Sequence, residues 1–480
     1  MARPTAALIH INPPHRILQS DALAIGWDKL ATMQSTWLKY LDRRVPRYTS
    51  YPTAVQFGTE VTTHTYKDWL ATLPPDGGVS IYIHVPFCSA LCFYCGCHTT
   101  VVRRYAPVAA YVDLLQREIG MIASIVGRRH VTHVHWGGGT PTILSADDFM
   151  GVMWALQSCF AVAPGAELAI EIDPRVLTRE YVATLAAAGI TRASLGVQEF
   201  NERVQQAVHR IQSFDQTARA ADWLRDVGVA KINVDLMYGL PYQTATTVAA
   251  TALRTLALAP DRIALFGYAH VPAMKRHQKL IPEPALADSL QRVTQSNAAA
   301  EVFVEAGYRR IGLDHFARSD DVLVARQREC RLHRNFQGYT ADEAPILLGI
   351  GASAISSLPQ GYAQNAASMI TYRNALLSSR LGTVRGCART DEDRLRGFII
   401  ERLMCDLHVD LGKACQAHGA PVNHFAAELG KIDELANDGI VIRSGECVTI
   451  PEPARPLVRT VCAIFDAYLA DDEARFSRAS

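Results

Sequence analysis

Four of the chain's eleven cysteines fall within residues 88–97, directly after an apolar, β-branched run. Three of them, Cys88, Cys92 and Cys95, have C-x3-C-x2-C spacing. A loop this short can direct three thiolates at one metal cluster. A four-iron cluster usually has four cysteine ligands. The spacing therefore predicts a [4Fe–4S] cluster with one iron open to another ligand.

A glycine run, Gly137-Gly138-Gly139-Thr140, follows a second strand-like segment. Residues without side chains let backbone groups approach a ligand closely. An open iron beside such a loop is what the reductive cleavage of S-adenosylmethionine requires, because the cofactor's amino and carboxylate groups can occupy the vacant position. An electron from the cluster would then give methionine and a 5′-deoxyadenosyl radical.

Two alternatives for the cysteines remain open at this point. A zinc knuckle could take Cys97 or His98 as its fourth ligand. A disulfide knot is less favoured, because an odd number of cysteines spread over a long chain without a secretory signal indicates a reducing compartment.

Charge and hydropathy exclude several classes of partner. The chain has 480 residues, with 48 basic and 47 acidic side chains and a net charge of +1. Nothing global therefore attracts nucleic acid or an anionic membrane, and local arginines must bind any anionic ligand. No run approaches the roughly 18 apolar residues of a membrane span, and the first ten residues lack signal-peptide features. We expect a cytoplasmic protein with no membrane span and no nucleic-acid partner.

From residue 79 onward, short β-branched runs alternate with longer segments of helical periodicity. Such alternation predicts a parallel sheet with right-handed crossovers, and we expect an α/β fold built on a partial (β/α)6 barrel. The expected strands are Val79–Val85, His133–Trp136, Leu168–Ile172, Arg192–Val197, Lys231–Leu236 and Arg262–Tyr268. The expected helices are Ala106–Ile125, Ala146–Cys159, Thr178–Ala188, Phe214–Val227 and Ala245–Leu258.

A polar or glycine-rich motif stands at the end of every expected strand. In such barrels, reactive groups lie where strands end and the following loops begin, so these motifs should face one mouth. Glu171 and Asp235 are carboxylates in apolar strands that must find donors or be neutralised. Ribose hydroxyls, an ammonium group or backbone N–H groups would each satisfy them. Arg210 could clamp a cofactor carboxylate, although a lone arginine at a helix end is often a surface residue.

We expect three parts along the chain. Residues 1–50 form an N-terminal arm that ends in a helix from Trp27 to Leu41, and residues 51–385 form the catalytic domain. Residues 386–480 form a smaller, mainly helical, winged-helix-like domain with a hairpin near Ile440–Ile450. The periodicity weakens from Leu381 to Arg389, where we place the linker. Gly349–Ser353 resembles a nucleotide-binding loop only weakly.

Several motifs resemble those of the oxygen-independent coproporphyrinogen III oxidases, radical S-adenosylmethionine (SAM) enzymes of haem biosynthesis. The cysteine motif marks only the radical SAM superfamily, whereas the stretches at 48–53 (YTSYPT) and 335–339 (NFQGY) are more specific. The resemblance implies that Cys88, Cys92 and Cys95 bind a [4Fe–4S] cluster and that Cys97 is a non-ligating cysteine. It also implies two bound SAM molecules. The matching cofactor-binding positions are Tyr82, Tyr94, Gly138, Gly139, Thr140, Glu171, Gln198, Arg210, Asp235, Ala269 and Ile355.

The implied activity is that of an oxidoreductase, coproporphyrinogen dehydrogenase. It would convert two propionate side chains of coproporphyrinogen III to vinyl groups and give protoporphyrinogen IX. An unidentified electron donor and acceptor would be needed, and we expect a monomer. The substrate carries four carboxylates, for which the sequence offers eight candidate arginines without ranking them: Arg43, Arg44, Arg47, Arg103, Arg104, Arg318, Arg331 and Arg334.

Two competing functions remain. A related haem-binding chaperone or haem-utilisation protein would share the cluster and the barrel, but the stretches at 48–53 and 335–339 and Cys97 argue against it. A zinc-stabilised βα scaffold that binds a partner through its C-terminal domain would contain zinc and no acid-labile sulfide.

Overall fold

The computed structural model describes residues 36–74, 77–469 and 479. Its centre is a set of parallel strands adjacent in chain order, each pairing with the next. These are β1 (Val79–Val85), β4 (His130–Gly138), β5 (Ala161–Ile172), β6 (Arg192–Gln198), β7 (Lys231–Tyr238) and β8 (Arg262–Gly267). The six predicted strands are confirmed. Over the described residues β1 and β8 do not pair, so the barrel is partial, as expected.

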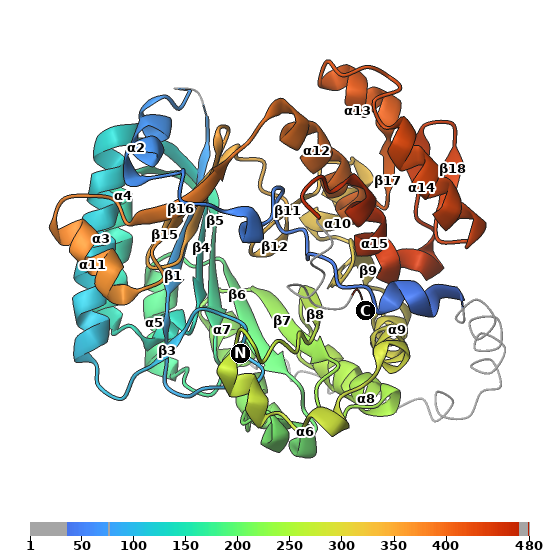
Figure 1. The fold of residues 1–480 in the computed structure, drawn as a ribbon. Helices are drawn as coiled ribbons and strands as arrows, with labels where there is room; N and C mark the ends of the chain where they lie inside the picture. Colours follow the sequence, from blue (N-terminus) through green and yellow to red (C-terminus); the bar gives the residue numbers. More distant parts are fainter. Residues whose placement is uncertain (1–35, 75–76, 470–478, 480) are drawn as a thin grey trace, which may run out of the picture.

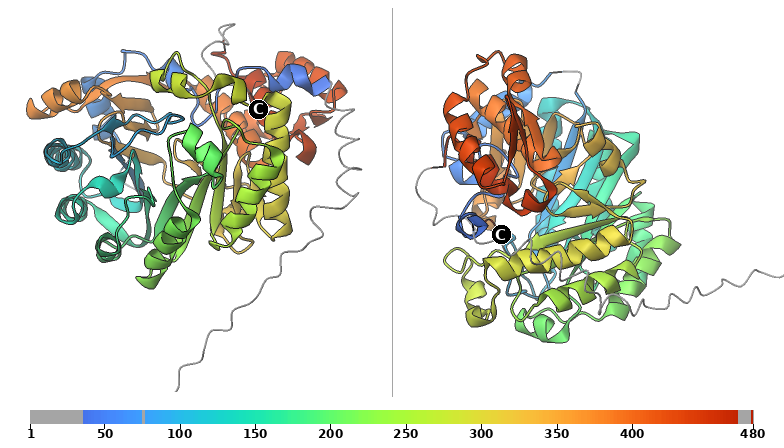
Figure 2. Two further views of the ribbon diagram at one scale, coloured as in Figure 1. Left: turned by 90° about the horizontal axis from the view of Figure 1, so that it is seen from below. Right: turned by 90° about the vertical axis from the view of Figure 1, so that its right-hand side faces the viewer.

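Helices that follow these strands lie along the outer face of the curved sheet (Figures 1 and 2). They are α3 (Ala106–Val126), α4 (Ala146–Cys159), α5 (Arg179–Ala187), α7 (Phe214–Asp226), α8 (Ala245–Leu256) and α9 (Ser289–Glu305), whereas the short α6 (Glu202–Ala207) packs near the strand ends, beside the cysteine loop. Their starts follow from local chemistry, because a side-chain oxygen that accepts from a first-turn N–H stabilises a helix end. Ser145 caps α4, Ser213 caps α7, and Thr244 closes a capping box on α8.

The sheet extends beyond the predicted strands on both sides. On one side β13 (Ile346–Ile350) pairs parallel with β1, followed by antiparallel strands; on the other, two short antiparallel strands follow β8. The added strands are β14 (Ile355–Leu358), β15 (Gly361–Asn365), β16 (Thr383–Ala388), β9 (Arg309–Ile311) and β10 (His315–Ala317). The linker expected from Leu381 to Arg389 is therefore wrong in part, because β16 occupies most of it and pairs with β15.

The turn at Gly349–Ser353 takes part in a buried hydrogen-bond network around Glu118. Glu118 of α3 accepts hydrogen bonds from the Gly351 N–H at 2.7 Å, the Asn365 amide at 2.7 Å and the Tyr372 hydroxyl at 2.6 Å. This buried carboxylate ties α3 to β13, β15 and α11 (Met369–Leu377). These three hydrogen bonds satisfy the Glu118 carboxylate, which would otherwise be costly to bury.

The C-terminal part has its own apolar core, and the described end of the N-terminal arm belongs to it. Buried side chains of α12 (Asp391–Asp406), α14 (Ala426–Asn437) and α15 (Val458–Cys462) pack with Trp37, Tyr40 and Tyr48. The Trp37 indole donates to the Asp438 carbonyl at 2.9 Å, and the Tyr40 hydroxyl donates to the Asp438 carboxylate at 2.5 Å. The described segment that begins at residue 36 thus lies against the C-terminal helices (Figure 1).

Other expectations fare as follows. Residues 36–41 are helical, whereas the beginning of the expected helix from Trp27 lies outside the described residues. The hairpin near Ile440–Ile450 is confirmed as β18 (Ile442–Ser444) and β19 (Cys447–Thr449), and β17 (His408–Asp410) pairs with β19 on the other side. The remaining helices are α2 (Thr63–Ala71), α10 (Val322–Arg328) and α13 (Leu411–Ala417). In the part of the chain that the structure describes, each helix is too short or too polar to cross a bilayer.

The Trp37 contact gives a stability prediction. Trp37→Ala removes a side chain that is 5% exposed, together with its hydrogen bond, from the C-terminal core. We expect the free energy of unfolding of that core to fall by about 3–5 kcal/mol, measured by urea titration. Leu38→Ala is the matched control, since Leu38 is 38% exposed and should change stability by less than about 1 kcal/mol. Equal effects of the two substitutions would contradict the assignment of the arm to this core.

Candidate active site at the mouth of the barrel

The carboxyl ends of the parallel strands bring most of the predicted residues to one edge of the sheet. Gly138 ends β4, Gln198 ends β6, and Glu171 and Asp235 lie near the ends of β5 and β7. Ala269 follows β8, and Cys88 lies on the short strand β2 (Phe87–Cys88) after β1. Ile355 is the exception, because it lies on β14 beyond β13. It reaches the same region through Gly349, which pairs with Tyr82 on β1. A Cβ at position 349 would lie only 2.5 Å from the Ile355 carbonyl oxygen, so only glycine allows this close approach.

Backbone hydrogen bonds hold the cysteine loop in place. The Phe93 N–H donates to the Val208 carbonyl at 2.9 Å, at the end of α6. The carbonyls of Tyr94 and Cys95 are bound by the side chains of Gln278 and His277 at 3.1 and 2.8 Å. Gln278 also donates to the Ala269 carbonyl at 3.1 Å, so it links the loop to the end of β8. The loop is therefore anchored on both sides by segments outside the cysteine motif.

Two arginines lie against the Cys92 sulfur. The guanidinium groups of Arg175 and Arg210 each approach Cys92 Sγ at 3.6 Å. Asp173 orients both, at 2.6 Å from Arg175 and 3.3 Å from Arg210. Arg210 also donates to the Gly196 carbonyl at 2.5 Å, so it is committed to this network and is not a surface residue. Both cations lie where they can offset negative charge on a group bound at this sulfur.

The other thiols differ in how readily they ionise. A hydrogen bond from Cys97 is the largest of the effects that lower the pKa of Cys95 to about 6. The same hydrogen bond raises the pKa of Cys97 well above its usual value. Burial raises the pKa of Cys88 to about 11, and the Thr140 hydroxyl, 3.5 Å from its sulfur, partly offsets this. Cys95 is thus the member of the pair that becomes a thiolate, and Cys97 is its proton donor.

This donor set fits an iron–sulfur cluster. All eleven cysteines are free thiols, and three of them stand on one anchored loop beside two cations that offset anionic charge. No three His, Cys, Asp or Glu side chains in residues 36–74 and 77–469 lie close enough together to hold a single metal ion. A preformed zinc knuckle, which needs four converging donors, is therefore absent from these residues.

Packing explains much of the glycine run. A Cβ at Gly137 would lie 2.7 Å from Glu171 Oε1, and one at Gly138, where φ is 112°, would lie 2.6 Å from the His84 ring. A Cβ at Gly139 would lie 2.5 Å from the Phe87 carbonyl oxygen. The three glycines therefore let β4 pass close to β1 and to Glu171, in addition to any contact they make with a ligand.

Four carboxylates line a cavity inside the barrel, the barrel cavity, and two of them, Glu171 and Asp235, are predicted site residues; Cys97, His135 and Arg47 also line it. Burial opposes ionisation of Glu171, but the His135 ring at 3.2 Å and the Gly138 N–H at 3.1 Å outweigh it and lower its pKa. Burial raises the pKa of Asp235 to about 6, although Ser194 and Asn233 donate to it at 2.8 and 2.9 Å. Of these two predicted site residues, Glu171 is therefore ionised, whereas Asp235 changes charge near pH 6.

Sequence reasoning missed three residues of this network as site residues: His135, Asp173 and Arg175. Asp173 and Arg175 follow Glu171 by two and four residues, so their place just past the end of β5 was a usable signal. His135 lies three residues before Gly138 on the same strand. Its contact with Glu171 depends on strand pairing and is not visible in the sequence.

Comparisons with known proteins agree with one another. Residues 82–254 match the model of the radical SAM superfamily. An oxygen-independent coproporphyrinogen III oxidase of Bradyrhizobium diazoefficiens is 48% identical over 92% of this chain and 98% of its own length. One of Salmonella typhimurium is 38% identical over 93% of this chain and 96% of its own. The solved structure of coproporphyrinogen III oxidase from Escherichia coli, described as a radical SAM enzyme, has a TM-score of 0.85 and 37% identity, covering 88% of this chain and 98% of that one.

The glycine packing gives a second prediction. In Gly139→Ala the new methyl group meets backbone that cannot move aside cheaply, so we expect a loss of about 1–3 kcal/mol in stability and weaker SAM binding. Gly96→Ala in the same region is the control, since nothing lies within 4 Å of its Cβ position. Thermal unfolding and equilibrium dialysis with labelled SAM measure both. If Gly139→Ala behaved like Gly96→Ala, the proposed close approach would be wrong.

Asp235 gives a prediction about pH. Its pKa in the folded protein, about 6, lies above the usual 3.8, so the folded state binds the extra proton and loses that stabilisation as pH rises through about 6. Asp235→Asn stays neutral. We expect the stability of the unliganded variant relative to wild type to increase from pH 4 to pH 7, by up to about 3 kcal/mol. Urea titrations at each pH measure the difference, and a pH-independent difference would contradict the raised pKa.

Proposed function

The chain belongs to the oxygen-independent coproporphyrinogen III oxidases of the radical SAM superfamily, and from that membership we propose how its own residues carry out the family's reaction. The enzyme decarboxylates two propionate side chains of coproporphyrinogen III to vinyl groups, giving protoporphyrinogen IX in haem biosynthesis. The observation that most supports this function is the similarity of almost the whole chain to oxygen-independent coproporphyrinogen III oxidases. The three-cysteine loop also lies at the barrel mouth. The alternative of a haem-binding chaperone is not favoured.

The cofactors are a [4Fe–4S] cluster and two molecules of SAM. When bound, the cluster supplies the electron that cleaves SAM to methionine and a 5′-deoxyadenosyl radical. We assign Cys88, Cys92 and Cys95 as its ligands. Two features of the donor set support this assignment. Arg175 and Arg210 offset negative charge at Cys92. Cys97 donates a hydrogen bond to Cys95, which favours the thiolate at Cys95 and the thiol at Cys97.

The assigned SAM-binding residues fall into two groups along the sheet. One lies toward β14, β1, β4 and β5, and contains Tyr82, Gly138, Glu171 and Ile355. The other lies toward β6, β7 and β8, and contains Gln198, Asp235 and Ala269, with Arg210 and Tyr94 beside it. Gly139 and Thr140 follow Gly138 and lie beside the first group, against Phe87 and Cys88. Two groups of this kind support one SAM molecule on each side of the cysteine loop.

The protein positions and protects the reactants. Glu171, held ionised by His135, accepts hydrogen bonds from ribose hydroxyls or an ammonium group. The barrel cavity keeps water and oxygen from the radical and fixes its distance to the substrate. At each propionate, one hydrogen atom leaves the β-carbon, CO2 leaves the carboxylate end, and one electron passes to an acceptor, which leaves a vinyl group. The acceptor therefore takes one electron for each propionate.

We also propose the cellular setting. An electron donor must reduce the cluster, and the enzyme acts as a monomer. A cytoplasmic location is supported by the eleven free thiols, because thiols persist in a reducing compartment.

A pair of cysteine substitutions tests the cluster assignment. Cys92→Ser removes a proposed ligand, and we expect a folded protein with little iron or sulfide, no absorbance near roughly 400 nm and no 5′-deoxyadenosine. Cys97→Ser alters a neighbour of the same loop that we do not assign as a ligand, and it should keep the cluster. Iron and acid-labile sulfide content, after anaerobic reconstitution, measures both. Full turnover by Cys92→Ser, or a complete loss of cluster in Cys97→Ser, would contradict the assignment.

A further inference from the structure

A segment after β8, residues 272–282, lies against the cysteine loop and is exposed on its other side. It contains the short 3-10 helix η3 (Arg276–Leu280), and we call it the loop clasp. Three of its side chains donate hydrogen bonds to carbonyls of the loop: Lys275 to Cys97 at 3.0 Å, His277 to Cys95 at 2.8 Å and Gln278 to Tyr94 at 3.1 Å. One layer of side chains therefore separates the exposed side of the loop clasp from the proposed cluster ligands.

The exposed side of the loop clasp combines basic and apolar side chains. Arg276 and Lys279 are exposed, and within residues 36–74 and 77–469 neither forms an ion pair. Met274 and Leu280 are 67% and 60% exposed. Met and Arg are enriched in protein interfaces, where apolar contacts are framed by polar groups. This combination indicates a protein partner.

Charge around the cysteine loop has one sign in the sequence. The chain has 47 acidic residues, yet none lies in residues 77–112, which contain the loop, or in residues 262–282, which end with the loop clasp. The exposed Glu283 is the first acidic residue after them. A chain whose net charge is only +1 thus concentrates positive charge at this place. Local charge of this kind steers the approach of a partner of opposite sign.

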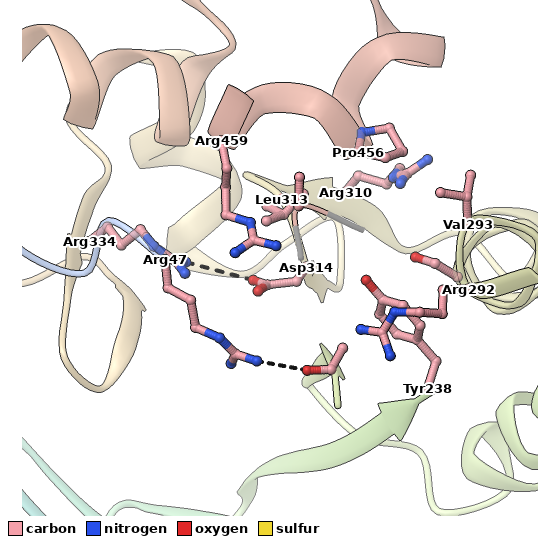
Figure 3. Close-up of a pocket in the computed structure, with 13 residues that line it drawn as sticks. Arg47, Tyr238, Arg292, Val293, Arg310, Leu313, Asp314, Arg334, Pro456 and Arg459 are labelled. Carbon is pink, nitrogen blue, oxygen red and sulfur yellow. Dashed lines mark hydrogen bonds and ion pairs between the residues drawn. The ribbon is translucent and has the colours of Figure 1, made fainter. Parts of the chain in front are cut away.

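A second basic cluster lies beyond the ends of β7 and β8 (Figure 3) and is enclosed. It consists of Arg47, Arg292 on α9, Arg310 on β9, Arg334 on β11 (His333–Asn335) and Arg459 on α15. These residues line a pocket of about 50 Å³, which is too small to admit the surface of another protein. Of the eight arginines considered from the sequence, Arg47 and Arg334 lie in this pocket. Arg103 and Arg104 are instead exposed just after β3 (Thr100–Val101), which pairs with β2 of the cysteine loop.

We propose that the loop clasp is the docking surface for an acidic protein that carries single electrons. This inference rests on the proposed function, which requires one external electron for each SAM that is cleaved. The carrier is oxidised by one electron, and the cluster, when bound, is reduced by one. Electron transfer between proteins requires the two redox groups to approach closely. The loop clasp allows this approach, because side chains of the same segment contact the cysteine loop directly.

Binding measurements test the proposal directly. The probe is a flavodoxin, a small acidic flavoprotein that transfers single electrons, and it is titrated anaerobically into the reconstituted enzyme in a calorimeter. The double variant Arg276→Glu, Lys279→Glu reverses two exposed charges. At about 0.01 M salt, where the Debye length is about 30 Å, we expect the variant to bind at least about tenfold more weakly than the wild type. The difference should shrink at about 0.1 M salt, where the Debye length is about 10 Å.

Two further double variants separate charge from contact. Lys67→Glu, Lys431→Glu changes the net charge equally at exposed side chains of α2 and α14, which lie far from β3 and α6 (Figure 1). This matched control should change binding by less than about twofold. Met274→Ser, Leu280→Ser removes the exposed apolar side chains without a change in charge. It should weaken binding by a similar factor at both salt concentrations, because apolar contacts are not screened by salt.

The choice of reductant separates docking from effects on the cluster. With reduced flavodoxin as the limiting reductant, we expect the charge-reversed variant to form 5′-deoxyadenosine about tenfold more slowly than the wild type. With dithionite, a small reductant that needs no docking surface, the two rates should agree. Iron and sulfide content and thermal unfolding should also agree, because within the described residues neither Arg276 nor Lys279 hydrogen-bonds to the loop through its side chain.

The remaining outcomes contradict the proposal. Unchanged flavodoxin binding by the charge-reversed variant, or no binding by the wild type at low salt, would exclude the loop clasp as the docking surface for an acidic carrier. Equal losses in the matched control would show an effect of net charge alone, and equal losses with dithionite would show a disturbed cluster. The proposed function fails separately, if the wild type forms 5′-deoxyadenosine with dithionite but does not convert coproporphyrinogen III. The binding measurements do not involve that substrate.

Discussion

The parallel direction of β1, β4, β5, β6, β7 and β8 is the constraint on which the rest of the structure depends. Because all six strands point the same way, every loop that follows a strand opens at the same edge, and residues far apart in the chain become neighbours there. The carboxylates of β5 and β7, the glycines after β4 and the cysteine loop after β1 meet for this reason. A single antiparallel strand among the six would send its loop to the opposite edge.

A second constraint is the packing of the C-terminal part beside the ends of β7 and β8. The end of the N-terminal arm packs into the C-terminal core through Trp37 and Tyr40, and the same segment carries Arg47 to the mouth. Arg459 reaches the mouth from α15 on the other side. The parallel strands thus carry the cysteine loop and the residues proposed to bind SAM, whereas the region beyond β7 and β8 is also lined by residues from the N-terminal and C-terminal segments.

The sequence predicted best what local chemistry decides. The strands and helices such as α4, which begins after a Ser145 cap, follow from periodicity to within a few residues, except that β5 begins at Ala161, seven residues before the predicted Leu168. The cysteine loop was recognisable because its three thiols are adjacent in sequence. The pairing of β13 with β1 was not predicted, since β13 lies far along the chain and its glycines suggested a loop. Arg292, Arg310 and Arg459 were missed because each lies in an ordinary helix or strand, and only tertiary packing brings them together.

An anaerobic assay of the reconstituted wild-type enzyme is the most direct test of the central claim. The enzyme receives dithionite, SAM, coproporphyrinogen III and an electron acceptor, and 5′-deoxyadenosine and protoporphyrinogen IX are followed together. Each propionate loses one hydrogen atom, so the account predicts both products, with two 5′-deoxyadenosine molecules for each protoporphyrinogen IX. Formation of 5′-deoxyadenosine without any porphyrin product would contradict the account and place the chain among the haem-handling relatives.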